Sequence, residues 1–235
     1  MNILGARRAS PAALVLFDID GTLIRRAGPH HREVLEEAVW RTARLSASTA
    51  EIPTQGMLDR DIISLMLRQA GVPVRQIAAL LPEIMRCAQA LYVRRCPDLQ
   101  RKVCPGVRRA LLELSRRNVL LGVVTGNLSR IGWKKLERAG IKSHFRFGAF
   151  AESGRTRAAL VRLAVGEAKK RGWINRTTPI TLIGDHPNDI GAAKASGVRS
   201  VAVATGLVGA AELATHEPDL LVDDLRSLDM DLLLC

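Results

Sequence analysis

Short apolar runs recur along the chain and end in small or acidic residues. Runs of this kind, rich in β-branched residues, are typical of parallel strands that are buried on both faces. Segments with the helical spacing of apolar positions lie between them. This alternation predicts an α/β fold, a doubly wound parallel sheet with helices on both sides. The predicted strands are residues 14–18, 120–126, 180–185, 200–206 and 220–224.

Four helices are predicted between these strands, over residues 107–117, 129–139, 157–171 and 189–196. Pro105 and Gly106 precede the first of them. The other three are each followed by glycine, at positions 140, 172 and 197. A glycine in this place allows the left-handed backbone that commonly ends a helix.

Residues 25–98 have a different pattern, with amphipathic helices predicted over 32–44, 59–70 and 74–95 and no convincing strand. Pro82 would kink the last helix or restart it. The chain therefore divides into an α/β core, residues 1–24 and 99–235, and an all-helical domain of residues 25–98 inserted after the first strand. The two junctions are expected near 23–26 and 97–105.

Composition and charge change this picture little. Hydrophobic residues make up 47% of the 235 residues, enough for a large core. The net charge of +12 raises nucleic acid as a partner. However, the basic residues are scattered in pairs and aromatic residues are only 3%, which leaves few rings to stack on bases. The sequence therefore argues against nucleic acid, while a positive field would speed the arrival of anionic substrates.

The sequence also predicts a cytoplasmic protein without a membrane partner. No apolar run approaches the roughly 18 residues of a membrane span. The N-terminus places basic residues before an apolar patch, as a secretory signal does, but Asp18 and Asp20 follow so closely that a strand is the better interpretation. The four cysteines form no Cys-x-x-Cys pair, which favours reduced thiols over a zinc site.

Three strands end in short polar signatures: FDIDGT (17–22), VVTGN (123–127) and IGDHPND (183–189). Ligands of open parallel sheets bind beyond the carboxyl ends of the strands, so these signatures are expected to meet there. Asp18 and Asp185 would then lie close together, and two buried carboxylates repel unless a cation pairs them. Hard oxygen ligands with room for water suit Mg²⁺.

The remaining residues of these signatures suit an anion. Gly126 and Asn127 would open a helix whose free backbone N–H groups point toward the same edge, and Thr125 adds a hydroxyl donor. Asp189, one turn further on, would hold a metal-bound water or position a neighbour. A metal, an anion cradle and spare carboxylates together indicate phosphoryl transfer, in which positioning and charge neutralisation supply most of the catalysis.

The three signatures, in this order, resemble the motifs of the haloacid dehalogenase (HAD) superfamily of aspartyl-phosphate enzymes, which have a Rossmann-like core. The helical insert resembles the cap domain of the phosphoglycolate phosphatase and β-phosphoglucomutase branch. Within it, TQGMLDRDI (54–62) is similar to that branch's Gly-x-Thr-Asp stretch, with Leu58 where Thr is usual. CPGVRRALLEL (104–114) is similar to the segment that re-enters the core.

The resemblance implies a role for each acid. Asp18 would be the nucleophile, and Asp20 the general acid and base. The carboxylates of Asp18 and Asp185 and the backbone carbonyl of Asp20 would ligate Mg²⁺. Family members that cleave carbon–halogen bonds, or that hydrolyse the aspartyl-phosphate slowly as ion pumps do, lack an acid at the position of Asp20. Its presence argues for a phosphatase or a phosphomutase.

The family also expects a cation, usually Lys, beside the phosphoryl group. Lys169 and Lys170 stand about 12 residues into the predicted helix, roughly 18 Å from its start, and would point away from the strand ends. Arg157, near the start of that helix, is better placed, with Arg155 in reserve. The alternative for Arg157 is an ordinary surface arginine.

Three other features are given structural interpretations. His186, where Thr or Ser is common in the family, is expected to hydrogen-bond the backbone of its loop. His30 and His31 are expected to be a polar helix start. Gly206 and Gly209 are expected to lie in a strand-to-helix turn, because the third glycine and the acid of a dinucleotide-binding loop are missing.

The leading hypothesis is a Mg²⁺-dependent phosphatase that acts on a small phosphorylated metabolite, a phosphate monoester of the phosphoglycolate kind, under a cap that excludes water. A sugar phosphomutase would share the same acids. A non-catalytic binding or regulatory protein on this scaffold is the alternative of another class. Clustered acids without a function would cost stability, which weighs against it.

Overall fold

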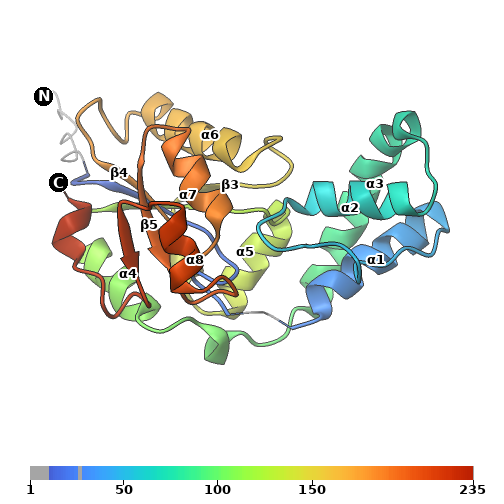
Figure 1. Ribbon diagram of the computed structural model, residues 1–235, viewed down its shortest axis with the longest axis horizontal. Coiled ribbons are helices and arrows are strands. Elements are labelled where there is room, and N and C mark those ends of the chain that lie inside the picture. The colour runs from blue at the N-terminus through green and yellow to red at the C-terminus, as the bar shows by residue number, and fades with distance from the viewer. Residues whose placement is uncertain (1–10, 26–27, 235) are drawn as a thin grey trace, which may run out of the picture.

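A computed structural model describes residues 11–25 and 28–234 of the chain. Its core is a six-stranded sheet, parallel throughout, in the order β3-β2-β1-β4-β5-β6 (Figure 1). The first strand is therefore central, and the strands that follow it in space come from distant parts of the sequence. The strands are β1 Leu14–Phe17, β2 Leu120–Val124, β3 Phe147–Ala149, β4 Ile180–Gly184, β5 Arg199–Val203 and β6 Leu220–Val222.

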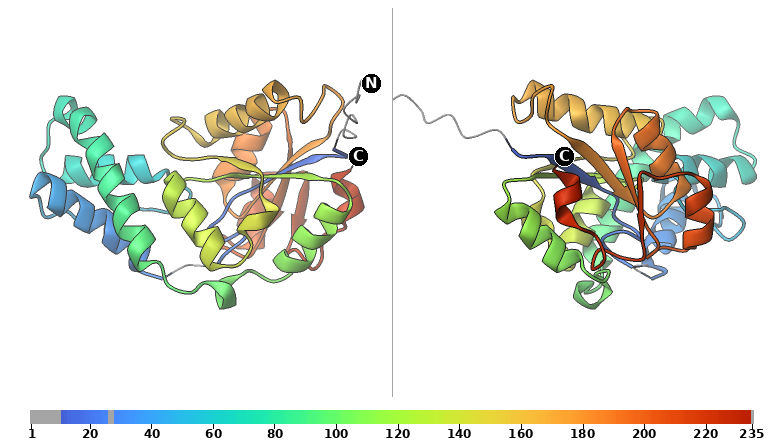
Figure 2. Two further views of the ribbon diagram at one scale, coloured as in Figure 1. Left: turned by 180° about the vertical axis from the view of Figure 1, so that it is seen from behind. Right: turned by 60° about the vertical axis from the view of Figure 1, so that its left-hand side comes forward.

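Helices cover both faces of this sheet, as the pattern predicts. Helices α6 and α7 lie on one face, and α4 and α5 lie on the other (Figure 2). The strands β1 and β2 are buried along their whole length, because both of their faces are covered. The helices of the core are α4 Val107–Arg116, α5 Ser129–Arg138, α6 Arg157–Lys170, α7 Pro187–Lys194 and α8 Ala210–Thr215, with single turns at η1 Gln100–Lys102, η2 Lys142–His144 and η3 Met230–Leu233.

The boundaries of these elements differ from the predictions in two ways. The predicted strands include Asp18, Thr125 and Asp185, but each of these residues lies just beyond the last strand residue. The edge strand β3 was not predicted, because its three residues in FRFGAF are too few to form a recognisable apolar run. Gly140 follows α5 with a φ of 69°, the left-handed conformation expected of it.

The insert contains three helices, α1 His30–Ala43, α2 Asp59–Gln69 and α3 Val74–Arg95, and the structure shows no strand between β1 and β2 in the part of the insert that it describes. Helix α3 continues through Pro82, so the alternative of a helix that restarts there is wrong. It packs against α1 and α2 and also against the core helix α5. Among the described helices none is long and apolar enough to cross a membrane.

The two connections between core and insert run side by side. The backbone N–H of Arg25 donates to the carbonyl of Lys102 at 2.7 Å, and that of Cys104 donates to the carbonyl of Leu23 at 3.0 Å. Ile24 and Val103 form an antiparallel bridge between them. The segments that lead from β1 into the three helices and from these helices back to α4 thus form a short paired ribbon. Residues 1–10, which include the basic part of the apparent secretory signal, and Cys235 lie outside the described residues.

Candidate active site

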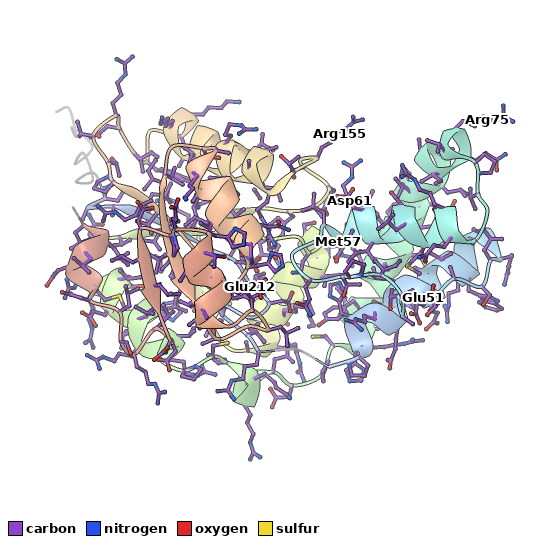
Figure 3. All side chains as sticks on the ribbon, in the orientation of Figure 1. Glu51, Met57, Asp61, Arg75, Arg155 and Glu212 are labelled. Carbon is purple, nitrogen blue, oxygen red and sulfur yellow. The ribbon has the colours of Figure 1, made fainter. Side chains whose placement is uncertain are left out.

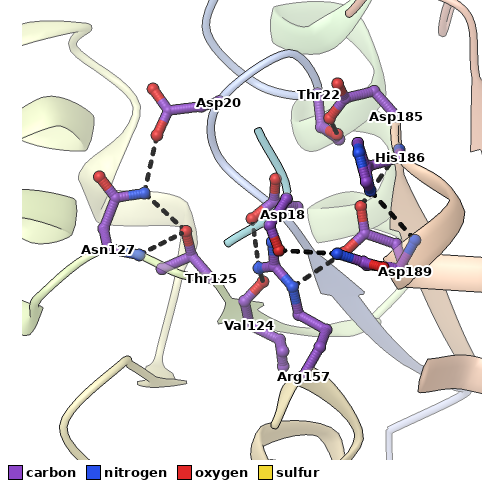
Figure 4. Close-up of polar contacts among 12 residues, drawn as sticks. Asp18, Asp20, Thr22, Val124, Thr125, Asn127, Arg157, Asp185, His186 and Asp189 are labelled. Atoms are coloured by element: carbon purple, nitrogen blue, oxygen red, sulfur yellow. Dashed lines mark hydrogen bonds and ion pairs between the residues drawn. The ribbon is translucent and has the colours of Figure 1, made fainter. Parts of the chain in front are cut away.

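The register of the sheet brings the three signatures together. Phe17, the last residue of β1, pairs with Val123 on one side and with Ile183 on the other. The residues that follow these three strands therefore share one edge of the sheet. Asp18, which is 5% exposed, donates its backbone N–H to the carbonyl of Ile183 at 3.0 Å. It lies at the centre of the cluster of polar side chains in Figure 4.

Arg157 is the cation beside Asp18. It is the first residue of α6 and is buried, so the alternative of a surface arginine is wrong. Its Nη1 donates to Asp18 Oδ1 at 2.8 Å and to the carbonyl of Val124 at 3.3 Å, and its Nε lies 3.2 Å from Asp189 Oδ1 (Figure 4). Burial lowers the pKa of the guanidinium, but Asp18 and Asp189 outweigh burial and raise it above its ordinary value.

The other candidate cations lie elsewhere. Arg155 is exposed and lies on the loop that precedes α6 (Figure 3). Lys169 and Lys170 are exposed in the last turn of α6, at the end remote from Arg157. This is the placement that their distance along the helix predicted.

Three buried acids form a potential metal site. Asp18, Asp185 and Asp189 each offer one carboxylate oxygen, and these atoms lie within 4.8 Å of one another. Arg157 pairs with Asp18 and Asp189, whereas Asp185 has no ion pair among the described residues. Its Oδ1 accepts a hydrogen bond from Thr22 Oγ1 at 2.9 Å.

The pKa values of the cluster show that its charge is not fully compensated. Burial, followed by the charges of Asp18 and Asp189, raises the pKa of Asp185 well above its ordinary value. Burial raises the pKa of Asp189 to about 7, with Arg157 opposing and Asp18 adding to the shift. A divalent cation would remove this repulsion, and three carboxylates are the hard ligands that Mg²⁺ prefers. The residues present therefore fit the metal that the sequence predicts.

Two glycines leave the space that the carboxylate of Asp185 occupies. A Cβ atom on Gly21 would lie 2.1 Å from Asp185 Oδ2, and one on Gly206 would lie 1.8 Å from the same atom. Gly21 also has a φ of 92°, which strains any other residue. Gly206 does lie in the turn between β5 and α8, as expected, but its second property, the close approach to Asp185, was not predicted.

His186 has the structural role expected of it. It is the N-cap of α7, its Nδ1 accepts from the backbone N–H of Asn188 at 3.1 Å, and its own N–H donates to Asp189 Oδ2 at 3.3 Å. This reciprocal capping holds Asp189 at the start of the helix. Burial and then Arg157 lower the pKa of the His186 ring.

Asp20 points away from Asp18 (Figure 4) and is held by a second group of residues. Asn127 Nδ2 donates to its Oδ2 at 2.7 Å, and Lys135 Nζ lies 2.7 Å from Oδ1 and 2.6 Å from Oδ2. The side chain is 37% exposed. Burial acts to raise its pKa, but Lys135, His31 and the hydrogen bonds from Lys135 and Asn127 together bring the pKa below its ordinary value.

Lys135 and His31 are site residues that the sequence reasoning missed. Lys135 lies on α5 and is 1% exposed. His31 is the second residue of α1, as a polar helix start requires, but its ring contacts Lys135 and Asp59. A signal for Lys135 was present, since it occupies an apolar helix face together with Leu128, Ile131 and Leu136. For His31 no comparable signal exists.

The VVTGN signature provides only part of the anion cradle that was expected. Thr125 is fully buried and its Oγ1 accepts from Asn127 Nδ2 at 2.7 Å. The hydroxyl proton of Thr125 and the N–H of Gly126 have no acceptor among the described residues, so both are available to an anion. The first amides of α5 are not free, because Leu128 N–H donates to Asp59 and Ser129 N–H donates to Glu152.

The insert contacts the core on both sides of these residues. The carbonyl of Gly56 accepts from Asn188 Nδ2 at 3.0 Å, and the N–H of Asp59 donates to the carbonyl of Gly126 at 2.8 Å. Leu58 stands where Thr is usual in the family that the sequence resembles. It is buried at the N-cap of α2 and provides no side-chain cap. Figure 3 shows Met57 on the side of the insert that faces the core.

A cavity of about 720 Å³ lies between insert and core. Its lining includes Asp18, Asp20, Thr125, Arg157 and Asp185, together with Arg25 and Arg32. A more open groove of about 800 Å³ lies along α5, lined by Arg130, Trp133 and Lys134 among others, but it contains none of the clustered acids. The chemistry is therefore concentrated in the first cavity.

Fold and site together define a class of α/β enzyme, with a cluster of buried acids at the carboxyl edge of a parallel sheet and a helical insert above it. The chain belongs to the haloacid dehalogenase-like hydrolase family, whose model matches residues 15–194. It is therefore a hydrolase, as the sequence resemblance implied, and the alternative of a non-catalytic protein is not supported.

Curated relatives are named phosphatases, and solved structures share the fold. The chain is 26% identical over 220 residues to the phosphoglycolate phosphatase of Synechococcus elongatus, covering 89% of this chain and 92% of the relative. It is 26% identical over 234 residues to that of Agrobacterium fabrum, covering 95% and 92%. CbbY from Rhodobacter sphaeroides, solved with phosphate, has the same fold with a TM-score of 0.70 and 20% identity, covering 94% of this chain and 98% of CbbY. β-Phosphoglucomutase from Clostridium difficile has a TM-score of 0.68 and 18% identity, covering 94% and 95%.

Proposed function

We propose that this protein is a Mg²⁺-dependent phosphatase that hydrolyses a small phosphate monoester through an aspartyl-phosphate on Asp18. The observation that carries the proposal is the arrangement around Asp18. One carboxylate oxygen is held by Arg157, two further acids lie beside it, and the free donors of Thr125 and Gly126 line the same cavity. Cation and free donors suit the phosphoryl oxygens, and the acids suit a metal.

In the proposed reaction Asp18 attacks phosphorus with the carboxylate oxygen that Arg157 leaves free. The bond from phosphorus to the ester oxygen breaks, and Asp20, which first takes up a proton from water, gives that proton to the departing alkoxide. Water then attacks the aspartyl-phosphate while Asp20 takes its proton, and phosphate leaves. The structure holds Asp20 on Lys135 and Asn127, in the lining of the same cavity as Asp18.

Asp18 and Asp185 and the backbone carbonyl of Asp20 would hold Mg²⁺, with Asp189 supporting them. When bound, the ion would neutralise charge on the acids and on the phosphoryl oxygens. Arg157 alone leaves Asp185 without a cationic partner among the described residues, which is the support that the structure offers for this assignment.

The substrate is proposed to be a small phosphorylated metabolite of the phosphoglycolate kind, acted on in the cytoplasm. The relatives named phosphoglycolate phosphatase support it. Arg25 and Arg32 in the cavity lining would favour an anionic group beyond the phosphate. We further propose that residues 25–98 act as the cap domain that covers the site, over a core of residues 1–24 and 99–235.

A sugar phosphomutase is the second candidate. The same two acids, Asp18 and Asp20, would serve it, and about 720 Å³ is room enough for a hexose phosphate. Incubation with a sugar 1-phosphate separates the two, since a mutase returns the 6-phosphate whereas a phosphatase returns free sugar and phosphate.

The decisive test is phosphate release from a panel of phosphorylated metabolites, with Mg²⁺ or with EDTA, by wild type and by Asp18→Asn. The amide is not a nucleophile, so turnover should fall at least about a thousandfold while the fold persists. Release that survives in the variant, or that EDTA leaves unchanged, would contradict the proposal.

A further inference from the structure

Lys135 is a buried lysine that none of the assignments above uses. Only 1% of the residue is exposed, although it neighbours Lys134 on the same helix, whose side chain is 22% exposed and pairs with Glu137 at 2.7 Å. A buried ammonium is costly unless it is paired and hydrogen-bonded. The contacts of Lys135 therefore indicate why this position tolerates a charge.

The ammonium of Lys135 contacts three different segments of the chain. It donates to both carboxylate oxygens of Asp20, at 2.7 and 2.6 Å, and to Asn127 Oδ1 at 2.6 Å. His31 Nδ1 from the insert lies 3.2 Å away. Because an ammonium only donates, the His31 Nδ1 accepts from it, and Nε2 then carries the proton that goes to Asp59 Oδ2 at 3.1 Å.

These contacts determine how the neighbouring side chains are oriented. With Oδ1 of Asn127 on Lys135, its Nδ2 faces both Asp20 Oδ2 and Thr125 Oγ1, each at 2.7 Å. Without Lys135, the Asp20 carboxylate would keep, among the described residues, only the hydrogen bond from Asn127, and the amide of Asn127 would be free to flip. One side chain therefore orients the acid after β1 and the polar residues after β2.

We infer that Lys135 is a positioning residue for the proton transfers of Asp20. It holds the side chains of Asp20 and Asn127 in fixed orientations in the lining of the cavity, without contacting the nucleophile. Each of the two buried cations thus orients a different acid, Arg157 orienting Asp18 and Lys135 orienting Asp20. The inference rests on the proposed function and adds to it a residue outside the three sequence signatures.

The test compares Lys135→Met with Lys134→Met, a matched change one residue away. The value of kcat/KM is measured on phosphoglycolate, an alkyl ester, and on p-nitrophenyl phosphate, whose leaving group needs little protonation. For an enzyme that forms an aspartyl-phosphate, kcat/KM reports the first phosphoryl transfer. Lys135→Met should lower kcat/KM roughly a hundredfold on phosphoglycolate and less than about tenfold on p-nitrophenyl phosphate, as impaired proton transfer requires. Lys134→Met should change neither by more than about twofold.

A merely structural role predicts a different result, with both substrates affected equally. In the Asp20→Asn background Lys135→Met should cost less than about threefold more, because the residue that it positions no longer transfers protons. Equal losses on the two substrates, or effects that add in the double variant, would overturn the inference. Should Lys135→Met fail to fold, Lys135→Gln keeps a donor for Asn127 and should show the same substrate dependence.

Failure of the inference and failure of the proposed function are distinguishable. Wild type that releases phosphate while Lys135→Met behaves like Lys134→Met overturns the inference alone. Wild type that is inactive on both compounds overturns the proposed function and the inference with it. A crystal structure of Lys135→Met adds a readout besides turnover, since unmoved Asp20 and Asn127 side chains would also overturn the inference.

Discussion

The two halves of the site differ in what holds them. Asp18, Arg157, Asp185 and Asp189 all come from the α/β core and are buried. Asp20 is held by Lys135, which also contacts His31 of the insert. The side chain of Asp20 is 37% exposed. The half that would bind and attack phosphorus is thus set by the α/β core alone, whereas the half that would move protons depends on how the insert lies on the core.

The largest effect is expected from the core half, at Arg157. Arg157→Ala removes the cation from between Asp18 and Asp189 and should lower kcat by roughly 10²–10³-fold, as loss of a preorganised charge does. Arg157→Lys should recover part of this. Steady-state phosphate release measures both, with Arg155→Ala as the control that should stay within about twofold. Full turnover of Arg157→Ala would remove its role.

A smaller effect is expected from the support of the metal site. Gly206→Ala would place a methyl group 1.8 Å from the present position of Asp185 Oδ2, so the carboxylate must move. The Mg²⁺ concentration for half-maximal activity should rise about tenfold, in the range that displaced ligand supports produce. Gly209→Ala, which meets nothing within 4 Å, is the matched control. An unchanged Mg²⁺ requirement in Gly206→Ala would show that Asp185 is not a ligand.

Asp59→Ala tests the half of the site that contains Asp20, at the junction of insert and core. Asp59 Oδ2 accepts from the N–H of Leu128, at the start of α5, and from His31. Its loss should lower the free energy of unfolding by about 1–2 kcal/mol, the usual contribution of a helix cap. Denaturant unfolding measures this, and Asp61→Ala on the same helix, with a side chain 46% exposed, should change little. Equal effects of the two variants would contradict the capping role.

The smallest effect is a pH dependence of the metal-free protein. Asp185 and Asp189 have raised pKa values in the fold, that of Asp189 being about 7. Between pH 4 and 7 the folded state therefore binds more protons than the unfolded state, and the stability that these groups contribute falls as pH rises. The melting temperature in EDTA should drop by roughly 3–5 °C from pH 5 to pH 8.

Mg²⁺ should reverse this trend, because it binds the deprotonated acids. The rise in melting temperature that Mg²⁺ causes should be larger at pH 8 than at pH 5, and Asp189→Asn should flatten the dependence in EDTA. Asp20 has the opposite shift and acts in another window, since its contribution is lost only as pH falls below about 4. A melting temperature in EDTA that rises toward pH 8 would contradict the raised pKa values of Asp185 and Asp189.

The fold and the core half of the site were largely predictable. Strands that are buried on both faces have a strong local signature, and the polar residues that end them must meet at one edge once the sheet forms. The strand β3 was the exception, because three residues at a sheet edge produce no periodic signal. Arg157 was predicted from its place at the start of a helix, although the burial that distinguishes it from Arg155 was not.

The other half could not be predicted in the same way. The expected free amides at the start of α5 are bonded to Asp59 and Glu152, which are distant in sequence from Leu128 and Ser129. His31 is one of two adjacent polar residues at a helix start, and its contacts with Lys135 and Asp59 distinguish it from His30. Pairings between separate elements leave no pattern in either segment.

By itself the sequence determined the α/β core, the helical insert and the acids at the strand ends, because hydrophobic periodicity and chain order are local properties that specify a parallel sheet. The tertiary structure alone decided which side chains the buried Lys135 contacts, which amides remain free and where Asp20 points. These depend on long side chains that reach across from separate elements, and their burial and pairing are set by packing distances of a few ångströms that no local pattern encodes.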